Sequence, residues 1–177
     1  MAGLLVLVLV PAVAAERPLA QAQTAAVHGD ATAAEQALRD AQRLRPWDAD
    51  IDLLGACQLA PLALHGDRTA AAGAVAHADR ALARLPRSTE ALRCGIEGDL
   101  GLGDLAAART RLDQALRLAP DNPELLLLSG YTYAAAGQLG PARGPLRAAT
   151  GNPFTAPRAQ ALLTQVDDAL AGRPAPG

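Results

Sequence analysis

The residues of this chain that could carry chemistry are few and scattered. Asp48, Asp50 and Asp52 alternate like the opening of a calcium-binding loop. That loop also needs glycine at its sixth position and glutamate at its twelfth, and this chain has Leu53 and Leu59 there. We therefore interpret the three aspartates as a charged turn and predict no metal site.

The other candidate groups also lack the context that a catalytic site requires. His28 and His65 occupy equivalent turns of a repeated pattern, and His77 stands alone in a predicted helix. The glycine-rich run at residues 101–106 resembles a dinucleotide fingerprint, but no strand precedes it. The chain contains neither G-x-S-x-G nor H-E-x-x-H. We predict that it is not an enzyme and that it has no catalytic residue and no cofactor.

Cys57 and Cys94 are the only cysteines, and they form no C-x-x-C motif. Each falls in the middle of a predicted helix, where a free cysteine behaves as a small apolar residue. We expect such packing. The alternative is a disulfide, which requires an oxidising compartment and a suitable Cα–Cα distance.

Composition indicates an all-α protein without a nucleic-acid partner. Of the 177 residues, 50% are apolar but only 2% are aromatic, so alanine and leucine must supply the packing. Small residues suit closely spaced helices and argue against a core built on sheets. The net charge is −2, so the chain has no basic footprint for nucleic acid.

The stretch from Gly103 to Gly137 predicts two helices joined by a tight turn. Asp104 can cap the first helix, and Pro120 ends it. Pro123 suits the first turn of the second helix. Apolar residues of the first helix follow steps of three and four and so share one face: Leu105, Ala108, Leu112, Ala115 and Leu116.

This pattern resembles the tetratricopeptide repeat (TPR), a 34-residue unit of two helices, here called helix A and helix B. One repeat matches the family pattern at Leu126, Ser129, Gly130, Tyr133, Gly137, Ala142, Leu146 and Ala149. The resemblance implies about four repeats over residues 15–156, stacked into a short right-handed superhelix. Residues 157–172 then form a C-terminal capping helix with one apolar side, and residues 173–177 a flexible tail.

Three features depart from a regular repeat. Pro61 should end its helix early and leave an irregular bulge before Thr69. Pro145 should make its helix short or bent. The helix A before Gly103 matches the family pattern poorly, because it has three glycines where helix formers are expected, each of which costs about 1 kcal/mol relative to alanine: Gly95, Gly98 and Gly101.

The resemblance implies that the chain binds a peptide or protein segment on a concave surface lined by helix A. The residues that this register places on the surface are Asp52, Leu59, Glu90, Arg93, Glu97, Glu124, Leu127 and Tyr131. The alternative is that they are solvated positions without a partner. The family's carboxylate clamp uses lysine and asparagine at these places, and this chain has neither there. An acidic chaperone tail is therefore not the expected partner.

Residues 2–15 are uncharged and largely apolar, yet too short to span a bilayer. Three interpretations remain open: a signal peptide, the end of a transmembrane helix that begins upstream, or a packed first helix. The first two imply membrane association or an extracytoplasmic location, and the third a cytoplasmic one. Residues 43–56 also resemble the C-terminal repeat region of bacterial O-antigen ligase-type membrane proteins. The alternative function is therefore a non-catalytic accessory tail of such a protein.

Overall fold

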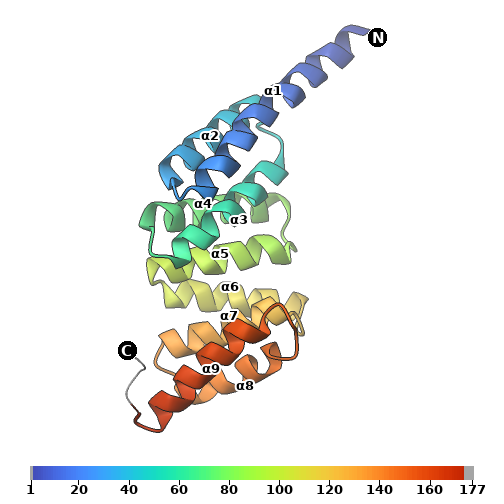
Figure 1. Ribbon diagram of the computed structural model, residues 1–177. Coiled ribbons are helices and arrows are strands. Elements are labelled where there is room, and N and C mark those ends of the chain that lie inside the picture. The colour runs from blue at the N-terminus through green and yellow to red at the C-terminus, as the bar shows by residue number, and fades with distance from the viewer. Residues whose placement is uncertain (1, 174–177) are drawn as a thin grey trace. The chain divides into compact units, whose positions relative to one another are not determined.

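The computed structural model describes residues 2–173, with side chains from residue 13 onward (Figure 1). Over these residues the chain consists of helices and connecting turns and has no strand, which confirms the all-α prediction. The helices are α1 (Ala2–Val27), α2 (Ala31–Leu44), α3 (Ala49–Leu64), α4 (Arg68–Arg84), α5 (Thr89–Leu102), α6 (Leu105–Leu118), α7 (Pro123–Ala135), α8 (Leu139–Ala149) and α9 (Ala156–Leu170).

The chain divides into two compact units at the turn before α6. Unit 1 comprises residues 1–102 with α1 to α5, and unit 2 comprises residues 103–177 with α6 to α9. In unit 1, α1 pairs with α2 and α3 pairs with α4, while α5 packs on both α3 and α4. In unit 2, α7 pairs with α8, and α9 packs mainly on α8.

The core of unit 1 consists largely of alanine, which lets the helices approach closely. Its fully buried side chains include Ala34, Leu38, Ala56, Leu59 and Ala74. Small side chains bring backbones together, and the few leucines fill the spaces that remain. This packing confirms the prediction of closely spaced helices that was made from the composition.

Two glycines of α5, Gly98 and Gly101, are packing residues and do not disrupt the helix. A Cβ atom on Gly98 would lie 3.0 Å from the carbonyl oxygen of Ala71 in α4. One on Gly101 would lie 2.6 Å from the carbonyl oxygen of Ala63 in α3. Because backbone oxygens cannot move aside, only glycine fits at such a position. Helix α5 runs without interruption from Thr89 to Leu102, so its glycines do not break it.

Pro61 also failed to have its predicted effect. It lies in the last turn of α3, which continues to Leu64, and α4 already begins at Arg68. The extra residues of this repeat lengthen both helices, to 16 and 17 residues, and no irregular bulge forms. The prediction for Pro145 was correct, because α8 has only 11 residues.

A glycine–aspartate pair begins each of the first three B helices, α2, α4 and α6. Gly103 adopts a φ of 77°, which glycine accepts readily, and the Asp104 carboxylate then accepts a hydrogen bond from the Ala107 N–H at 2.9 Å. Asp30 and Asp67 cap α2 and α4 in the same way. The predicted cap at Asp104 is confirmed.

The backbone of residues 2–15 is helical and continuous with the rest of α1. The side chains of residues 2–12 lie outside the described part of the chain, as do residues 174–177 of the predicted tail. Where the structure describes the chain, no helix is long and apolar enough to cross a membrane.

Candidate functional site

The predicted binding residues of α3 lie inside unit 1. Leu59 is fully buried in the core, and Asp52 is only 4% exposed. The Asp52 carboxylate accepts hydrogen bonds from Gln42 of α2 at 2.5 Å and from Arg80 of α4 at 2.8 Å. Both residues face the B helices, so the predicted register placed them incorrectly on the surface.

The outward side of α3 carries a different stripe, which includes Leu54, Cys57, Gln58 and Pro61. Leu54 is 38% exposed. Together with the end of α1, this stripe surrounds an open hollow of about 500 Å³. The residues that line it are Gln23, Ala26, Val27, Leu54, Cys57, Gln58, Pro61 and Leu62. Most of these side chains are apolar, so the hollow offers a surface on which an apolar side chain can bind.

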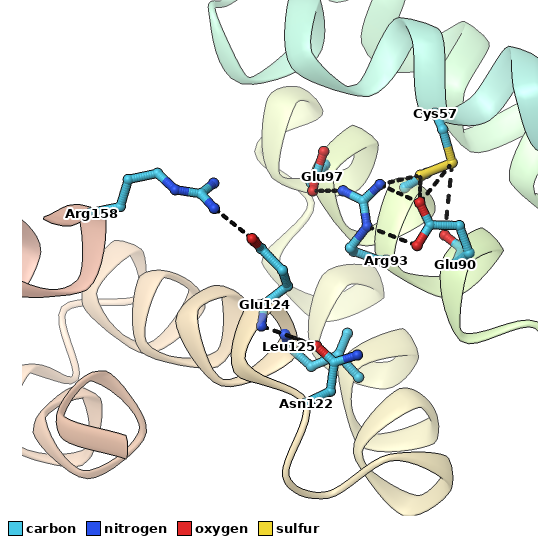
Figure 2. Close-up of polar contacts among 9 residues, drawn as sticks. Cys57, Glu90, Arg93, Glu97, Asn122, Glu124, Leu125 and Arg158 are labelled. Atoms are coloured by element: carbon cyan, nitrogen blue, oxygen red, sulfur yellow. Dashed lines mark hydrogen bonds and ion pairs between the residues drawn. A yellow bond between two sulfur atoms is a disulfide. The ribbon is translucent and has the colours of Figure 1, made fainter. Parts of the chain in front are cut away.

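The predicted residues of α5 form one chain of ion pairs (Figure 2). Arg93 hydrogen-bonds to Glu90 at 2.6 Å on one side and pairs with Glu97 on the other. The three are exposed to very different degrees, since Glu97 is nearly buried and Glu90 is open to solvent. Glu90 is therefore the group of this chain of ion pairs that a partner could reach most easily.

These contacts also affect protonation. The hydrogen bond from Arg93 holds the pKa of Glu90 below its ordinary value, although burial acts in the opposite direction. Burial acts to lower the pKa of Arg93, but its contacts with Glu90 and Glu97 raise it above the ordinary value. Glu90 and Arg93 are therefore both charged at neutral pH.

A disulfide between Cys57 and Cys94 joins α3 to α5 beside this chain of ion pairs. Their Cα atoms lie 5.1 Å apart, within the usual range for a disulfide. The expectation that both are free apolar packing residues was therefore wrong. With Glu90 they bring ligand atoms within 4.8 Å of one another. Because the two sulfurs are bonded to each other, neither is the thiolate that a metal site requires.

A buried polar cluster was missed by the sequence analysis. His77 is fully buried, and its Nδ1 lies 3.0 Å from Asp52 Oδ1 and 2.8 Å from Arg80. Its Nε2 lies 3.6 Å from Glu35 Oε1 of α2. The spacing of His77 and Arg80 on one helix gave no indication of two carboxylates contributed by other helices. The cluster joins α2, α3 and α4, and we interpret it as structural.

In unit 2, the predicted residues of α7 differ in their exposure. Leu127 is 7% exposed and belongs to the core with Leu146 and Leu163. Glu124 forms an ion pair with Arg158 of α9 at 2.6 Å (Figure 2), and Tyr131 is 45% exposed. Of these three predicted residues, Glu124 and Tyr131 are therefore accessible on unit 2.

Comparison with known proteins supports the resemblance. Residues 99–166 match the tetratricopeptide repeat family. Among curated proteins, none matches the sequence. A thermophilic TPR protein of Thermus thermophilus is similar in structure, with 23% identity, a TM-score of 0.68 and coverage of 90% of this chain and 84% of that one.

Two further solved structures have the same fold. A tetratricopeptide repeat protein from Parabacteroides merdae has 19% identity and a TM-score of 0.59, over 88% of this chain and 60% of that one. A mutant of MamA has 15% identity and a TM-score of 0.59, over 91% of this chain and 90% of that one. The chain is therefore a tetratricopeptide repeat protein in fold, and residues 99–166 also carry the sequence pattern of that family.

Proposed function

We propose that the chain is a protein-binding module that holds a peptide or protein segment on the helix A face of unit 1. This face is defined by Val27, Leu54, Gln58, Pro61 and Glu90. The observation that carries the proposal is the hollow between α1 and α3, because it leaves Leu54 and Val27 partly or largely exposed. Exposed apolar groups that line a concavity mark interaction sites. TPR folds generally serve as interaction modules rather than as catalysts.

The chemistry of this face indicates the kind of segment that fits. An apolar side chain would enter the hollow, and a basic side chain would lie beside the Glu90 carboxylate, which is exposed to solvent. An acidic segment would be repelled by the Glu90 carboxylate, and this chain has no lysine with which it could pair. We expect a partner segment with apolar residues next to a lysine or arginine.

A displayed library of random peptides, selected on the purified oxidised protein, tests this proposal. Selected peptides should be rich in apolar and basic residues. When one is added to 15N-labelled protein, the amide signals of Val27, Leu54 and Gln58 should shift. Shifts confined to α2 and α4 would place the binding surface on the other side of unit 1 and contradict the proposal.

The disulfide favours a second candidate, in which the module lies outside the cytoplasm as an accessory tail of a membrane protein. Disulfides persist in oxidising compartments and are rare in the cytosol. Acid quenching of cells followed by thiol alkylation tests this location. Cys57 and Cys94 should be blocked from alkylation until a reductant is added. Alkylation without reductant would remove the support for an extracytoplasmic location.

A further inference from the structure

We propose that the Cys57–Cys94 disulfide is a thiol-exchange site, at which an external dithiol attacks Cys57 and displaces the thiolate of Cys94. This inference is independent of peptide binding. The bond joins α3 to α5 within unit 1, and its two sulfurs lie in very different surroundings. Those differences determine which sulfur can be attacked and which can leave.

The two cysteines differ in their accessibility. Cys94 is fully buried, whereas Cys57 is partly exposed and belongs to the lining of the hollow between α1 and α3. An incoming thiolate can therefore approach the Cys57 sulfur through the hollow. Exchange rates depend on which sulfur is accessible to attack. Attack at Cys57 makes Cys94 the leaving group.

The positive charge of Arg93 favours the same direction. Nη2 of Arg93 lies 3.1 Å from the Cys94 sulfur, so a positive charge is in place when that sulfur becomes a thiolate. Nearby cations lower the pKa of a thiol, and a thiol of lower pKa leaves faster. Glu90 opposes the reaction, because its Oε1 lies 3.7 Å from the Cys57 sulfur and repels an incoming thiolate. The same oxygen lies 4.0 Å from the Cys94 sulfur, so it also acts against the thiolate that leaves there.

The disulfide is reduced in two successive exchange steps. In the first, a thiolate of the dithiol forms a bond to the Cys57 sulfur, the Cys57–Cys94 bond breaks, and Cys94 leaves as a thiolate. In the second, the other thiol of the reagent, as its thiolate, attacks the mixed disulfide and releases the Cys57 thiolate. The dithiol becomes a cyclic disulfide, so two electrons pass from it to the protein.

The rate of reduction by dithiothreitol tests the role of Arg93. Arg93→Gln should slow reduction by about three- to tenfold, while Arg93→Lys, which retains the charge, should stay close to wild type. Glu124→Gln serves as a matched control, because it removes a paired surface glutamate in unit 2, and its rate should be unchanged. Reduction of Arg93→Gln as fast as wild type, or faster, would overturn the assigned role.

The direction of attack is tested independently, with a single thiol. When oxidised protein is treated with glutathione and quenched with acid, mass spectrometry of its peptides should find glutathione on Cys57 rather than on Cys94. Glu90→Gln should accelerate this step, and the difference from wild type should shrink at high salt because screening weakens the repulsion. Glutathione on Cys94, or equal amounts on both, would overturn the proposal.

Discussion

Gly130 shows how strongly a single residue can determine packing in this fold. A Cβ atom at this position would lie 2.4 Å from Cγ of Leu146, a side chain that is itself fully buried. Gly140 lies in the first turn of α8 and has no atom within 4 Å of such a Cβ. These two glycines of neighbouring helices therefore have opposite roles.

We predict that Gly130→Ala lowers the free energy of unfolding by about 1–3 kcal/mol, because the added methyl group overpacks the core. Gly140→Ala should be neutral or slightly stabilising, since alanine favours helix. Urea unfolding of both variants checks this. Equal stabilities would show that α7 and α8 do not pack through Gly130.

Glu35 predicts a dependence of stability on pH. The facing His77 ring holds the pKa of Glu35 below its ordinary value, with help from the charges of Arg39 and Arg80, although burial acts in the opposite direction. A carboxyl group with a lowered pKa stabilises the folded state above its unfolded pKa, which is about 4.3. This contribution is lost as the pH falls through the lower, folded value.

We therefore expect Glu35→Gln to weaken the fall in stability below about pH 4.3, because glutamine cannot take up a proton. Chemical unfolding at a series of pH values on both sides of this point measures the slope. An unchanged slope would mean that the contact between Glu35 and His77 contributes nothing to acid sensitivity.

At the scale of elements, the turns that begin the B helices are nearly equivalent except in the last repeat. Asp30, Asp67 and Asp104 each accept a backbone hydrogen bond at the start of their helices. Gln138 occupies the same position before α8 and makes no such bond with its side chain, although its backbone angles are close to those of Asp104. The start of α8 thus lacks a cap that the other B helices have.

Gln138→Asp should therefore raise the free energy of unfolding by about 1 kcal/mol. The new carboxylate can accept hydrogen bonds from the N–H groups of the first turn of α8. It would also lie close to Arg109, which now contacts Gln138 at 3.4 Å. Thermal unfolding by circular dichroism gives the comparison, and Asp104→Ala should shift the midpoint in the opposite direction. A lower midpoint for Gln138→Asp would contradict this account.

The elements of this fold were largely predictable, because helix periodicity and turn residues are local signals. The repeated glycine–aspartate turns and the length of α8 follow from such signals. The behaviour of Pro61 and Gly101 was not predictable. Gly101 is required because the carbonyl oxygen of Ala63 lies against it, and a sequence pattern does not contain that information. Pro61 is accommodated in the last turn of α3, and the sequence alone did not fix where that helix ends.

At the scale of the whole chain, the candidate site depended on contacts between distant segments. Asp52 and Leu59 share a face of α3, but that face is the buried one. The repeat register predicted from the sequence could not show that His77 and Arg80 of α4 lie against Asp52. Likewise, Cys57 and Cys94 are 37 residues apart, and only the packing of α3 on α5 brings their sulfurs together.

The disulfide predicts a large effect on the stability of unit 1. Closing a loop of this length lowers the conformational entropy of the unfolded chain. In the chain-entropy description this raises the free energy of unfolding by about 3–4 kcal/mol. Reduction should therefore lower the unfolding midpoint, as should Cys57→Ala combined with Cys94→Ala. Urea unfolding followed by far-UV circular dichroism, with and without reductant, measures this. A midpoint that is insensitive to reductant would mean that the bond adds no stability.

If a partner segment binds the helix A face of unit 1, its affinity depends on the leucine that lines the hollow and not on an equally exposed leucine elsewhere in the unit. Leu54 lines the hollow and is 38% exposed, while Leu44 ends α2 and is 36% exposed. The measurement is the affinity of one selected peptide for Leu54→Gln and for Leu44→Gln, by isothermal titration calorimetry. We predict about tenfold weaker binding for Leu54→Gln, as loss of a buried leucine contact implies, and unchanged binding for Leu44→Gln. Equal affinities for the two variants, or a loss only with Leu44→Gln, would contradict it.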